Sequence, residues 1–409
     1  MRTTANPEEE LRRLFPEMVE WRRHLHRNPE LSFQEKKTSA WIADRLRGFG
    51  CEVREGIGGY GVMAVVRGAL PGPAVALRAD IDALPIEDEK TVAYRSSVPG
   101  VMHACGHDAH TAALLGVARY YTDNRAALTG DRVLLFQPAE EVAPGGAVAM
   151  IADGALGGVD AVYGVHLWSP LAFGKVATKA GPLMAAVDDF YIDITGKGGH
   201  GALPHQTVDA IVAGAAVVQA LQTIVSRSVD PLQPAVVTVG SIQAGNAVNV
   251  IADTCRLGGT VRTFDEGVRK LVKERLRLIV EQTCALHGAG MKLDYREGYP
   301  ALVNDAREAA RFFEVAPRLF DREQVEEAEP VMAGEDFAYY LREVPGCFLF
   351  VGAGNEACGA VHPHHHPRFD VDERGMLVSA ALLIALADDY AGSDKTGRGN
   401  GAAEPQPAG

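Results

Sequence analysis

Hydrophobic residues recur at helical spacing near the N-terminus and at strand spacing soon after it. The spacing predicts two amphipathic helices, over 7–26 and 34–49, which end at Asn28-Pro29 and at Gly50. Apolar runs of strand length follow, over 62–67, 74–79, 132–137 and 161–166. Because helical stretches separate several of these runs, the pattern predicts an α/β domain with a mostly parallel, helix-covered sheet.

A different pattern begins at Val187. Alternating Phe190, Ile192 and Ile194 predict a strand. A helix, two strands, a helix and a strand are expected after it, over 209–226, 235–242, 256–262, 266–287 and 291–295. This βαββαβ order is that of a ferredoxin-like unit. We therefore expect an inserted ferredoxin-like lid or dimerisation domain over 184–296.

The catalytic domain is expected on both sides of this insertion, over 1–183 and 297–391. Its second part should include an apolar strand over 347–351 and a closing helix over 373–390. The last residues, 392–409, are polar and rich in Gly, Ala and Pro, which predicts a disordered tail.

Composition narrows the classes of function. The chain has 409 residues, 47% of them hydrophobic, which is enough for two or three domains. Lys and Arg number 40 against 53 Asp and Glu, so the net charge is −13, and no basic run is present. These features argue against a nucleic-acid or membrane partner and favour a small-molecule substrate. The absence of a secretory signal pattern and six scattered cysteines predict a cytoplasmic protein.

Reactive side chains are densest over 102–110, where the sequence reads Met-His-Ala-Cys-Gly-His-Asp-Ala-His. Cys105 and His107 are two residues apart, so they share a side in loop or extended backbone but not on a helix. We therefore expect both in a loop that opens into a buried helix running to about Asn124. Thiolate and imidazole suit a transition metal, although a buried thiol beside hydrogen-bonded histidines would explain the cluster equally well.

More polar side chains follow the predicted strands. Asp80 and Asp82 come after one strand, Glu140 and Glu141 after another, and His166 closes a third. Because sites in open α/β sheets form beyond the carboxyl ends of the strands, we expect these side chains to converge.

Two adjacent glutamates need a turn in the backbone before both can reach one site. Neighbouring residues of a strand point to opposite faces, and Pro138 with the Pro-Gly-Gly run over 144–146 offers the required break. A solvated pair of carboxylates is the alternative interpretation of Glu140 and Glu141.

The chain contains every part of a two-metal site. Such a site needs a bridging anion, several N, O or S ligands and a base that is not spent on metal. Cys105 could bridge and Glu140 could act as the base. The remaining candidate ligands are His107, Glu141, His166 and one histidine of the run over 362–366.

The inserted domain contributes three further candidates. His200 lies in a glycine-rich run over 196–201, where it could donate to an oxyanion or simply be an exposed turn residue. Asn249 could bind the same oxyanion through its amide. Arg262 could hold a substrate carboxylate, although an ordinary solvated arginine explains it as well.

An ordered set of motifs runs through the chain. It comprises Arg78-Ala-Asp-Ile-Asp-Ala-Leu-Pro85, Met102-His-Ala-Cys-Gly-His-Asp108, Phe136-Gln-Pro-Ala-Glu-Glu141, Gly196-Lys-Gly-Gly-His200, Asn249-Val-Ile-Ala-Asp253, Gly259-Thr-Val-Arg262, Gly334-Glu-Asp-Phe337 and His365-His-Pro-Arg-Phe-Asp370. Together these motifs resemble the metal-dependent aminoacylase and carboxypeptidase superfamily. Within it, they resemble the branch of hippurate hydrolases and plant auxin–amino acid conjugate hydrolases.

The resemblance implies two divalent metal ions per chain, zinc or manganese, with nickel or cobalt as alternatives. The implied ligands are Cys105 as the bridge, His107, Glu141, His166 and His365. Glu140 would be the general base and Asp82 would support the ligands from outside their shell. The resemblance also implies a homodimer formed through the inserted domain, in which His200 can complete the active site of the neighbouring subunit.

Three positions depart from the family pattern. Ala252 replaces a usual proline, Gly201 a common alanine and His364 a usual leucine. None of these changes removes a ligand. Because His364 and His366 flank His365, the choice of His365 rests on its offset from Pro367.

These observations predict a hydrolase that cleaves the amide bond of an N-acyl or N-aroyl amino acid with metal-activated water. His200 and Asn249 would stabilise the oxyanion, and Arg262 would hold the substrate carboxylate. A carboxypeptidase or dipeptidase would use the same site and is the alternative. A non-catalytic metal- or ligand-binding protein is the hypothesis from a different class, and the intact Glu140 argues against it.

Overall fold

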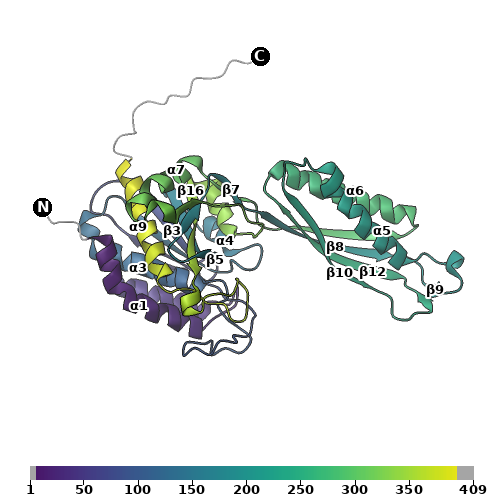
Figure 1. Cartoon of the computed structure of the whole chain (residues 1–409), viewed down its shortest axis with the longest axis horizontal. Helices are drawn as coiled ribbons and strands as arrows, with labels where there is room; N and C mark the ends of the chain where they lie inside the picture. Colours follow the sequence, from purple (N-terminus) through teal and green to yellow (C-terminus); the bar gives the residue numbers. More distant parts are fainter. Residues whose placement is uncertain (1–5, 394–409) are drawn as a thin grey trace, which may run out of the picture. The chain divides into compact units, whose positions relative to one another are not determined.

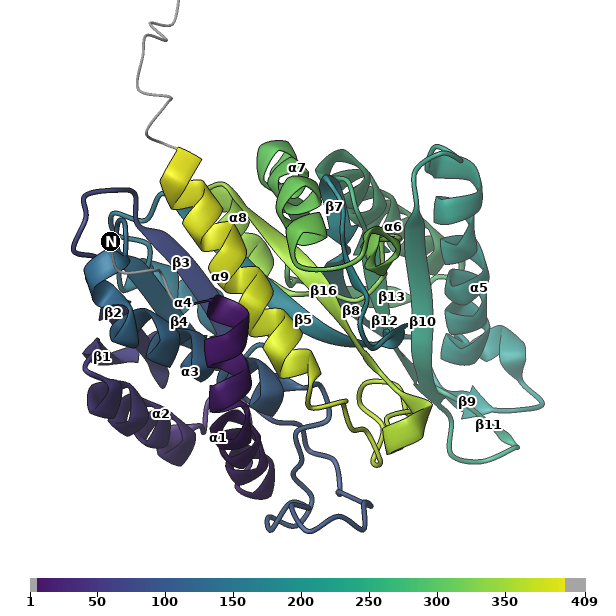
Figure 2. The same cartoon turned by 60° about the vertical axis from the view of Figure 1, so that its left-hand side comes forward.

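The computed structural model describes residues 6–393, drawn in two views in Figures 1 and 2. Contacts divide the chain into two compact units. The first unit contains residues up to 180, 304–328 and those from 340 onward, and the second contains 181–303 and 329–339. The domain limits expected at 183/184, 296/297 and 391/392 stay predictions. Most of the expected C-terminal tail, from residue 394 on, lies outside the described residues.

An eight-stranded sheet forms the centre of the first unit. Its central strands β4, β3, β5 and β16 are parallel, β1 and β2 pair antiparallel at one edge, and β6 pairs antiparallel with β16. The expected mostly parallel sheet is therefore confirmed. In spatial order the strands are β1 (Glu52–Ile57), β2 (Gly61–Val66), β4 (Arg132–Gln137), β3 (Val75–Asp80), β5 (Ala161–Ala172), β16 (Gly346–Gly354), β6 (Val176–Thr178) and β15 (Val325–Glu327).

Helices cover this sheet in more than one layer. Helices α3 and α9 pack on the central strands, and α1 lies beside both of them, as both views show. The side chain of Asn6 caps α1 by accepting from the amide of Glu8, and its apolar residues recur every three or four positions. The helices of this unit are α1 (Pro7–Arg27), α2 (Lys36–Phe49), α3 (His107–Asp123), α4 (Gly146–Ala152), α7 (Ala306–Val315), α8 (Tyr340–Glu343) and α9 (Gly375–Ser393).

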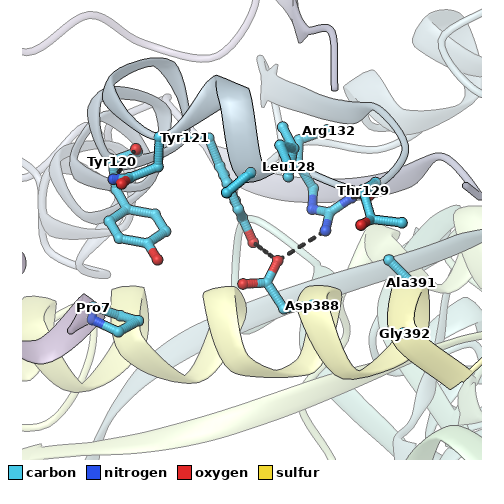
Figure 3. A pocket seen from close by; sticks show the side chains of 11 residues that line it. Pro7, Tyr120, Tyr121, Leu128, Thr129, Arg132, Asp388, Ala391 and Gly392 are labelled. Atoms are coloured by element: carbon cyan, nitrogen blue, oxygen red, sulfur yellow. Dashed lines mark hydrogen bonds and ion pairs between the residues drawn. The ribbon is translucent and has the colours of Figure 1, made fainter. Parts of the chain in front are cut away.

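A buried arginine at the start of β4 forms a hydrogen bond with the C-terminal helix α9. Arg132 begins β4, and its Nη2 donates to Oδ1 of Asp388 on α9 over 2.8 Å. The hydroxyl of Tyr121 donates to the same oxygen over 3.0 Å (Figure 3). This cluster lies at the N-terminal end of β4, whereas the candidate site follows its C-terminal end.

The second unit is an antiparallel sheet covered by two helices. Its strands follow the spatial order β10, β12, β8 and β13, which together with the chain order confirms the expected ferredoxin-like topology. Phe190, Ile192 and Ile194 point into its core, as their alternation predicts. The elements are β8 (Ala186–Thr195), α5 (Ala210–Thr223), β10 (Ala235–Ala244), β12 (Thr254–Thr263), α6 (Glu266–Leu286) and β13 (Gly290–Glu297).

Short strands complete the two units. A two-stranded ribbon pairs β9 (Gly199–His200) with β11 (Val250–Ile251), and another pairs β7 (Gly181–Met184) with β14 (Leu302–Asn304). Two helical segments, Ala210–Ser228 and Gly375–Ser393, have the length and apolar composition of a membrane span, but each packs into the core of its own unit. All six cysteines lie within the described residues and are free thiols.

Candidate metal centre and active site

The segment from Cys105 to His107 turns sharply at a glycine. Gly106 has a φ of +100° and precedes α3, so His107 is the first residue of the helix. The expectation that both Cys105 and His107 lie in a loop is therefore wrong for His107. Because glycine carries no Cβ, it allows a positive φ that turns the chain directly into the helix and leaves no room for a longer loop.

Two histidines of this cluster are oriented by their Nδ1 atoms. Nδ1 of His107 lies 3.0 Å from the carbonyl oxygen of Asp82 and 3.1 Å from its Oδ1. Nδ1 of His166 lies 3.0 Å from the carbonyl oxygen of Leu167. Since a carbonyl only accepts, both Nδ1 atoms carry the proton and both Nε2 atoms are left as acceptors. Nε2 of His166 points at the sulfur of Cys105, 3.5 Å away.

The glutamate pair sits on a turn made by the preceding alanine. Ala139 has a φ of +53°, in the left-handed region, and this bends the chain before Glu140 and Glu141. Oε1 of Glu141 lies 3.7 Å from Nε2 of His107. The loop closes tightly behind the pair, because a Cβ on Gly146 would lie 2.0 Å from the carbonyl oxygen of Pro138.

Of the late histidines, His365 faces the cluster. Its Nε2 lies 3.4 Å from Oε1 of Glu141, and its amide donates to the carbonyl of Ala104 over 2.8 Å. Nε2 of His364 instead accepts from the amide of Ser169, and burial beside His110 lowers the pKa of His364 to about 3. His366 stacks on His362, with ring centroids 4.3 Å apart.

The donor atoms fall into overlapping groups that fit a pair of metal ions. Each group has its atoms within 4.8 Å of one another, and among the groups are Cys105 with His107 and His166, Cys105 with Glu141 and His365, His107 with Glu140 and Glu141, and Asp80 with His107 and His110. Within residues 6–393, Nε2 of His107 and Oε1 of Glu141 are buried and have no hydrogen-bond partner. Buried polar atoms are costly to leave unsatisfied, so a bound cation explains why these two face each other.

The electrostatics of the site also fit a cation. Burial lowers the pKa of His107, but Asp80, Asp82 and Glu141 outweigh burial and raise it to about 10, so without a cation Nε2 would carry a proton that a metal ion would displace. Burial together with Glu141 and Glu140 raises the pKa of Cys105 well above its usual value. A site with this excess of carboxylates favours positive charge, and divalent ions would supply it and stabilise the thiolate.

Asp80 and His110 also belong to this cluster, although no role was predicted for them. Oδ1 of Asp80 lies 2.7 Å from Nδ1 of His110, and its Oδ2 accepts from Arg78 over 2.7 Å. Both oxygens are therefore engaged, and Oδ2 of Asp80 also lies 3.6 Å from Nε2 of His107, whereas Asp82 contacts Nδ1 of that ring. The signal available in the sequence was the position of Asp80 at the end of a strand and of His110 one helical turn after His107.

The remaining predicted residues, His200, Asn249 and Arg262, belong to the second unit. His200 pairs with Val250 across the β9–β11 ribbon, and the carbonyl of Asn249 accepts from the amide of Gly201 over 2.8 Å. Arg262 pairs with Val187 near the C-terminal end of β12, whereas Asn249 precedes the N-terminal end of that strand. Arg262 is separated from the start of that strand by about 26 Å of extended chain. His200 and Asn249 are thus neighbours, and Arg262 lies apart from them.

Several known proteins have amino-acid sequences similar to this one. The chain is 50% identical over 300 residues to an N-acyl-L-amino acid amidohydrolase of Geobacillus stearothermophilus, covering 72% of this chain and 81% of the relative. It is 46% identical over 371 residues to an N-acetyl-L-cysteine deacetylase of Bacillus subtilis, covering 91% and 87%. A thermostable carboxypeptidase of Saccharolobus solfataricus is 42% identical over 391 residues, covering 93% and 99%.

A solved structure extends the likeness to three dimensions. The crystal structure of YxeP from Bacillus subtilis, described as a dinuclear metal-binding peptidase of the M20 family, matches with a TM-score of 0.80 and 36% identity. The match covers 93% of this chain and 99% of that one. Residues 76–389 match the peptidase family M20/M25/M40. The chain therefore belongs to this family and is a metal-dependent hydrolase of amide bonds.

Proposed function

We propose that this protein hydrolyses the amide bond of N-acyl or N-aroyl amino acids with the help of two divalent metal ions. The observation that carries the proposal is the convergence of one thiol, three imidazoles and two carboxylates, with His107 and Glu141 facing each other through unsatisfied buried atoms. The identity to an N-acyl-L-amino acid amidohydrolase supports this substrate class.

Cys105, His107, Glu141, His166 and His365 would hold the ions. When bound, the ions polarise the amide carbonyl and lower the pKa of water, which is the chemistry that such sites supply. A thiolate ligand favours zinc, and the mixed N and O donors also suit manganese.

Glu140 would move the protons of the reaction. Its carboxylate belongs to the group formed with His107 and Glu141, which supports a role beside water held at that group. It would take a proton from that water and deliver it to the nitrogen of the leaving amino acid. Asp82 would hold His107 in the tautomer that leaves Nε2 available.

His200 and Asn249 would stabilise the oxyanion, and Arg262 would hold the substrate carboxylate. His200 and Asn249 are exposed at one end of the second unit, beside the fully exposed Val248 and the half-exposed Val250. Exposed apolar residues next to polar ones suit contact with a second copy of the chain. We therefore propose a homodimer in which these two residues serve the neighbouring active site.

We also propose a cytoplasmic location, which the free thiols of the six cysteines fit.

A carboxypeptidase or dipeptidase is the second candidate. The observation that favours it is the 42% identity to a thermostable carboxypeptidase. Both activities release an amino acid from an acyl group through the same chemistry, so they differ only in what the acyl pocket accepts.

Amino acid release from hippurate, N-acetyl amino acids and dipeptides tests the proposal. The protein is first chelated and then reloaded with zinc or manganese, and metal content is measured at each stage. We expect release to vanish on chelation, to return with metal and to be fastest with an N-acyl or N-aroyl substrate. Fastest release from dipeptides would favour the carboxypeptidase. No release with any metal, from protein that binds two ions, would contradict both.

A further inference from the structure

Glu140 lies between two backbone amides, each held by a buried carboxylate. The amide of Ala139 donates to Oε1 of Glu35 over 2.8 Å, and the amide of Glu141 donates to Oδ2 of Asp82 over 3.0 Å. Glu35 and Asp82 are both almost fully buried. The backbone on each side of the proposed base is therefore fixed by a specific hydrogen bond.

The residue that Glu35 holds is one of the few with a strained backbone. Ala139, Phe33 and His365 are the non-glycine residues with positive φ among residues 6–393. L-residues rarely adopt this conformation, and they keep it only where the surroundings impose it. Oε1 of Glu35 also accepts from the amide of Phe33, over 3.0 Å, so one oxygen atom holds two of the three strained residues.

The turn at Ala139 sets the direction of the glutamate that follows it. Strand β4 ends at Gln137, and the positive φ of Ala139 turns the chain just after it, so this turn sets the direction in which Glu140 leaves the strand. Glu141 is additionally fixed by Asp82, which in turn accepts from the hydroxyl of Ser32 over 2.7 Å.

We propose that Glu35 is a positioning residue that keeps Ala139 in its left-handed conformation and thereby aims Glu140 at the attacking water. This inference rests on the proposed function of Glu140. Glu35 itself touches no reacting atom.

The chemistry of Glu35 fits a fixed acceptor. Its Oε2 has no hydrogen-bond partner in the described part of the chain, so one oxygen makes both contacts. Burial raises the pKa of Glu35 to about 7. A carboxylic acid and a carboxylate both offer an acceptor oxygen, and so does an amide. Glu35→Gln should therefore preserve the turn, whereas Glu35→Ala should release it.

The test compares kcat, KM and metal content of four variants. We expect Glu35→Ala to lower kcat about 10- to 100-fold, the range seen for residues that orient a metal site, with a much smaller change in KM and with both ions retained. Glu35→Gln should stay close to the parent protein. Adding Ala139→Gly to Glu35→Ala should restore most of the lost kcat, because glycine adopts a positive φ without help.

Phe33→Gly in the Glu35→Ala background is the matched control, since it relaxes the other amide on the same oxygen. Rescue by Phe33→Gly instead of Ala139→Gly, or an unchanged kcat in Glu35→Ala, would overturn the inference. If Glu35→Ala does not fold, Ala139→Val tests the same turn with Glu35 intact. Its branched side chain opposes a positive φ, so kcat should fall, and normal turnover would overturn the inference.

Glu140→Gln separates this inference from the proposed function. If that variant keeps normal turnover, Glu140 is not the base, and its proposed role fails together with the inference that rests on it. If Glu140→Gln is inactive while Glu35→Ala is normal, only the role of Glu35 is wrong.

Discussion

The candidate residues of the two units are held in opposite ways. In the first unit, His107 and His166 are buried, and each has its Nδ1 fixed by a neighbouring carbonyl. In the second unit, His200 and Asn249 are exposed at a two-stranded ribbon, where Nδ1 of His200 accepts from the amide of Ala202 over 3.1 Å but the ring stays open to solvent. The side chains of the metal centre are thus buried and held within their own unit, whereas those at the ribbon are held in part and remain exposed.

This difference fits two separate roles, metal binding and proton transfer in the first unit and substrate contact in the second. Ligands and the base need fixed geometry before substrate arrives, since small displacements of reacting groups cost large factors in rate. If His200 and Asn249 act from a second subunit, as proposed, they can stay exposed until the dimer and the substrate order them. Variants of the two regions should therefore fail in different ways.

The largest effect is expected from Glu140→Gln. Loss of the proton-transfer group should lower kcat about 100- to 10,000-fold, while metal content stays the same because the other ligands remain. Turnover with N-acyl amino acids and metal analysis of the same preparation check both parts. A variant that binds both ions and turns over normally would contradict the assignment of Glu140.

The next effect concerns the exposed region. His200→Ala should lower kcat about 100- to 1,000-fold, as removal of an oxyanion donor does, without changing metal content. Mixing this variant with Glu140→Gln under conditions that exchange subunits distinguishes the two possible arrangements. If His200 acts on its neighbour, mixed dimers hold one intact site, and a 1:1 mixture should recover about a quarter of full activity.

The same mixture has a clear opposite outcome. If His200 acts within its own chain, both sites of a mixed dimer lack one group, and activity stays at the level of the separate variants. That result would contradict the proposal that His200 acts on the neighbouring subunit, because the residues of both units would then serve the site of their own chain.

A smaller and more local effect is expected from His365→Ala. The variant should bind one metal ion fewer per chain, because Nε2 of His365 is the histidine nitrogen of the late run that faces Glu141. His366→Ala is the matched control and should keep both ions, since that ring stacks on His362 instead. Metal analysis after gel filtration decides between them, and loss of metal in the control alone would move the ligand to His366.

Patterning predicted most of the fold because the hydrophobic signal is strong where strands and helices are buried. Strand β4 was predicted with its observed bounds, and α1, β12 and α6 within a few residues of theirs. Strand β1 was missed because most of its residues are exposed and polar, so the alternation of a half-buried strand is weak there. Strand β5 was cut short at His166 although pairing with β16 carries it on to Ala172.

The site was predicted in part. The ligand-type residues at the strand ends could be predicted, but the contact of Glu35 with Ala139 depends on a partner far away in the sequence. Nothing local indicates that Glu35 accepts from an amide 104 residues later, or that Ala139 has a positive φ. Alanine is an ordinary residue in sequence terms, and only tertiary context forces it into the left-handed region.

The smallest functional effect is expected from Asp388→Ala, which changes the framework of the first unit and leaves the site alone. Without the carboxylate, Nη2 of the buried Arg132 loses its hydrogen-bond acceptor, and the hydroxyl of Tyr121 loses one of its acceptors (Figure 3). A buried donor that loses its partner costs about 1–3 kcal/mol, so the midpoint of unfolding should fall. Arg132 begins the strand that Gln137 ends, so kcat per folded molecule should stay normal.

Asp388→Asn is the matched control, because its amide oxygen can still accept from Arg132, and it should lose less stability than Asp388→Ala. Urea denaturation and kcat are measured on the same samples. A fall in kcat in proportion to the loss of stability would mean that the buried site shifts with its framework. The preorganisation that sets the first unit apart from the exposed ribbon would then be weaker than the hydrogen bonds to His107 and His166 indicate.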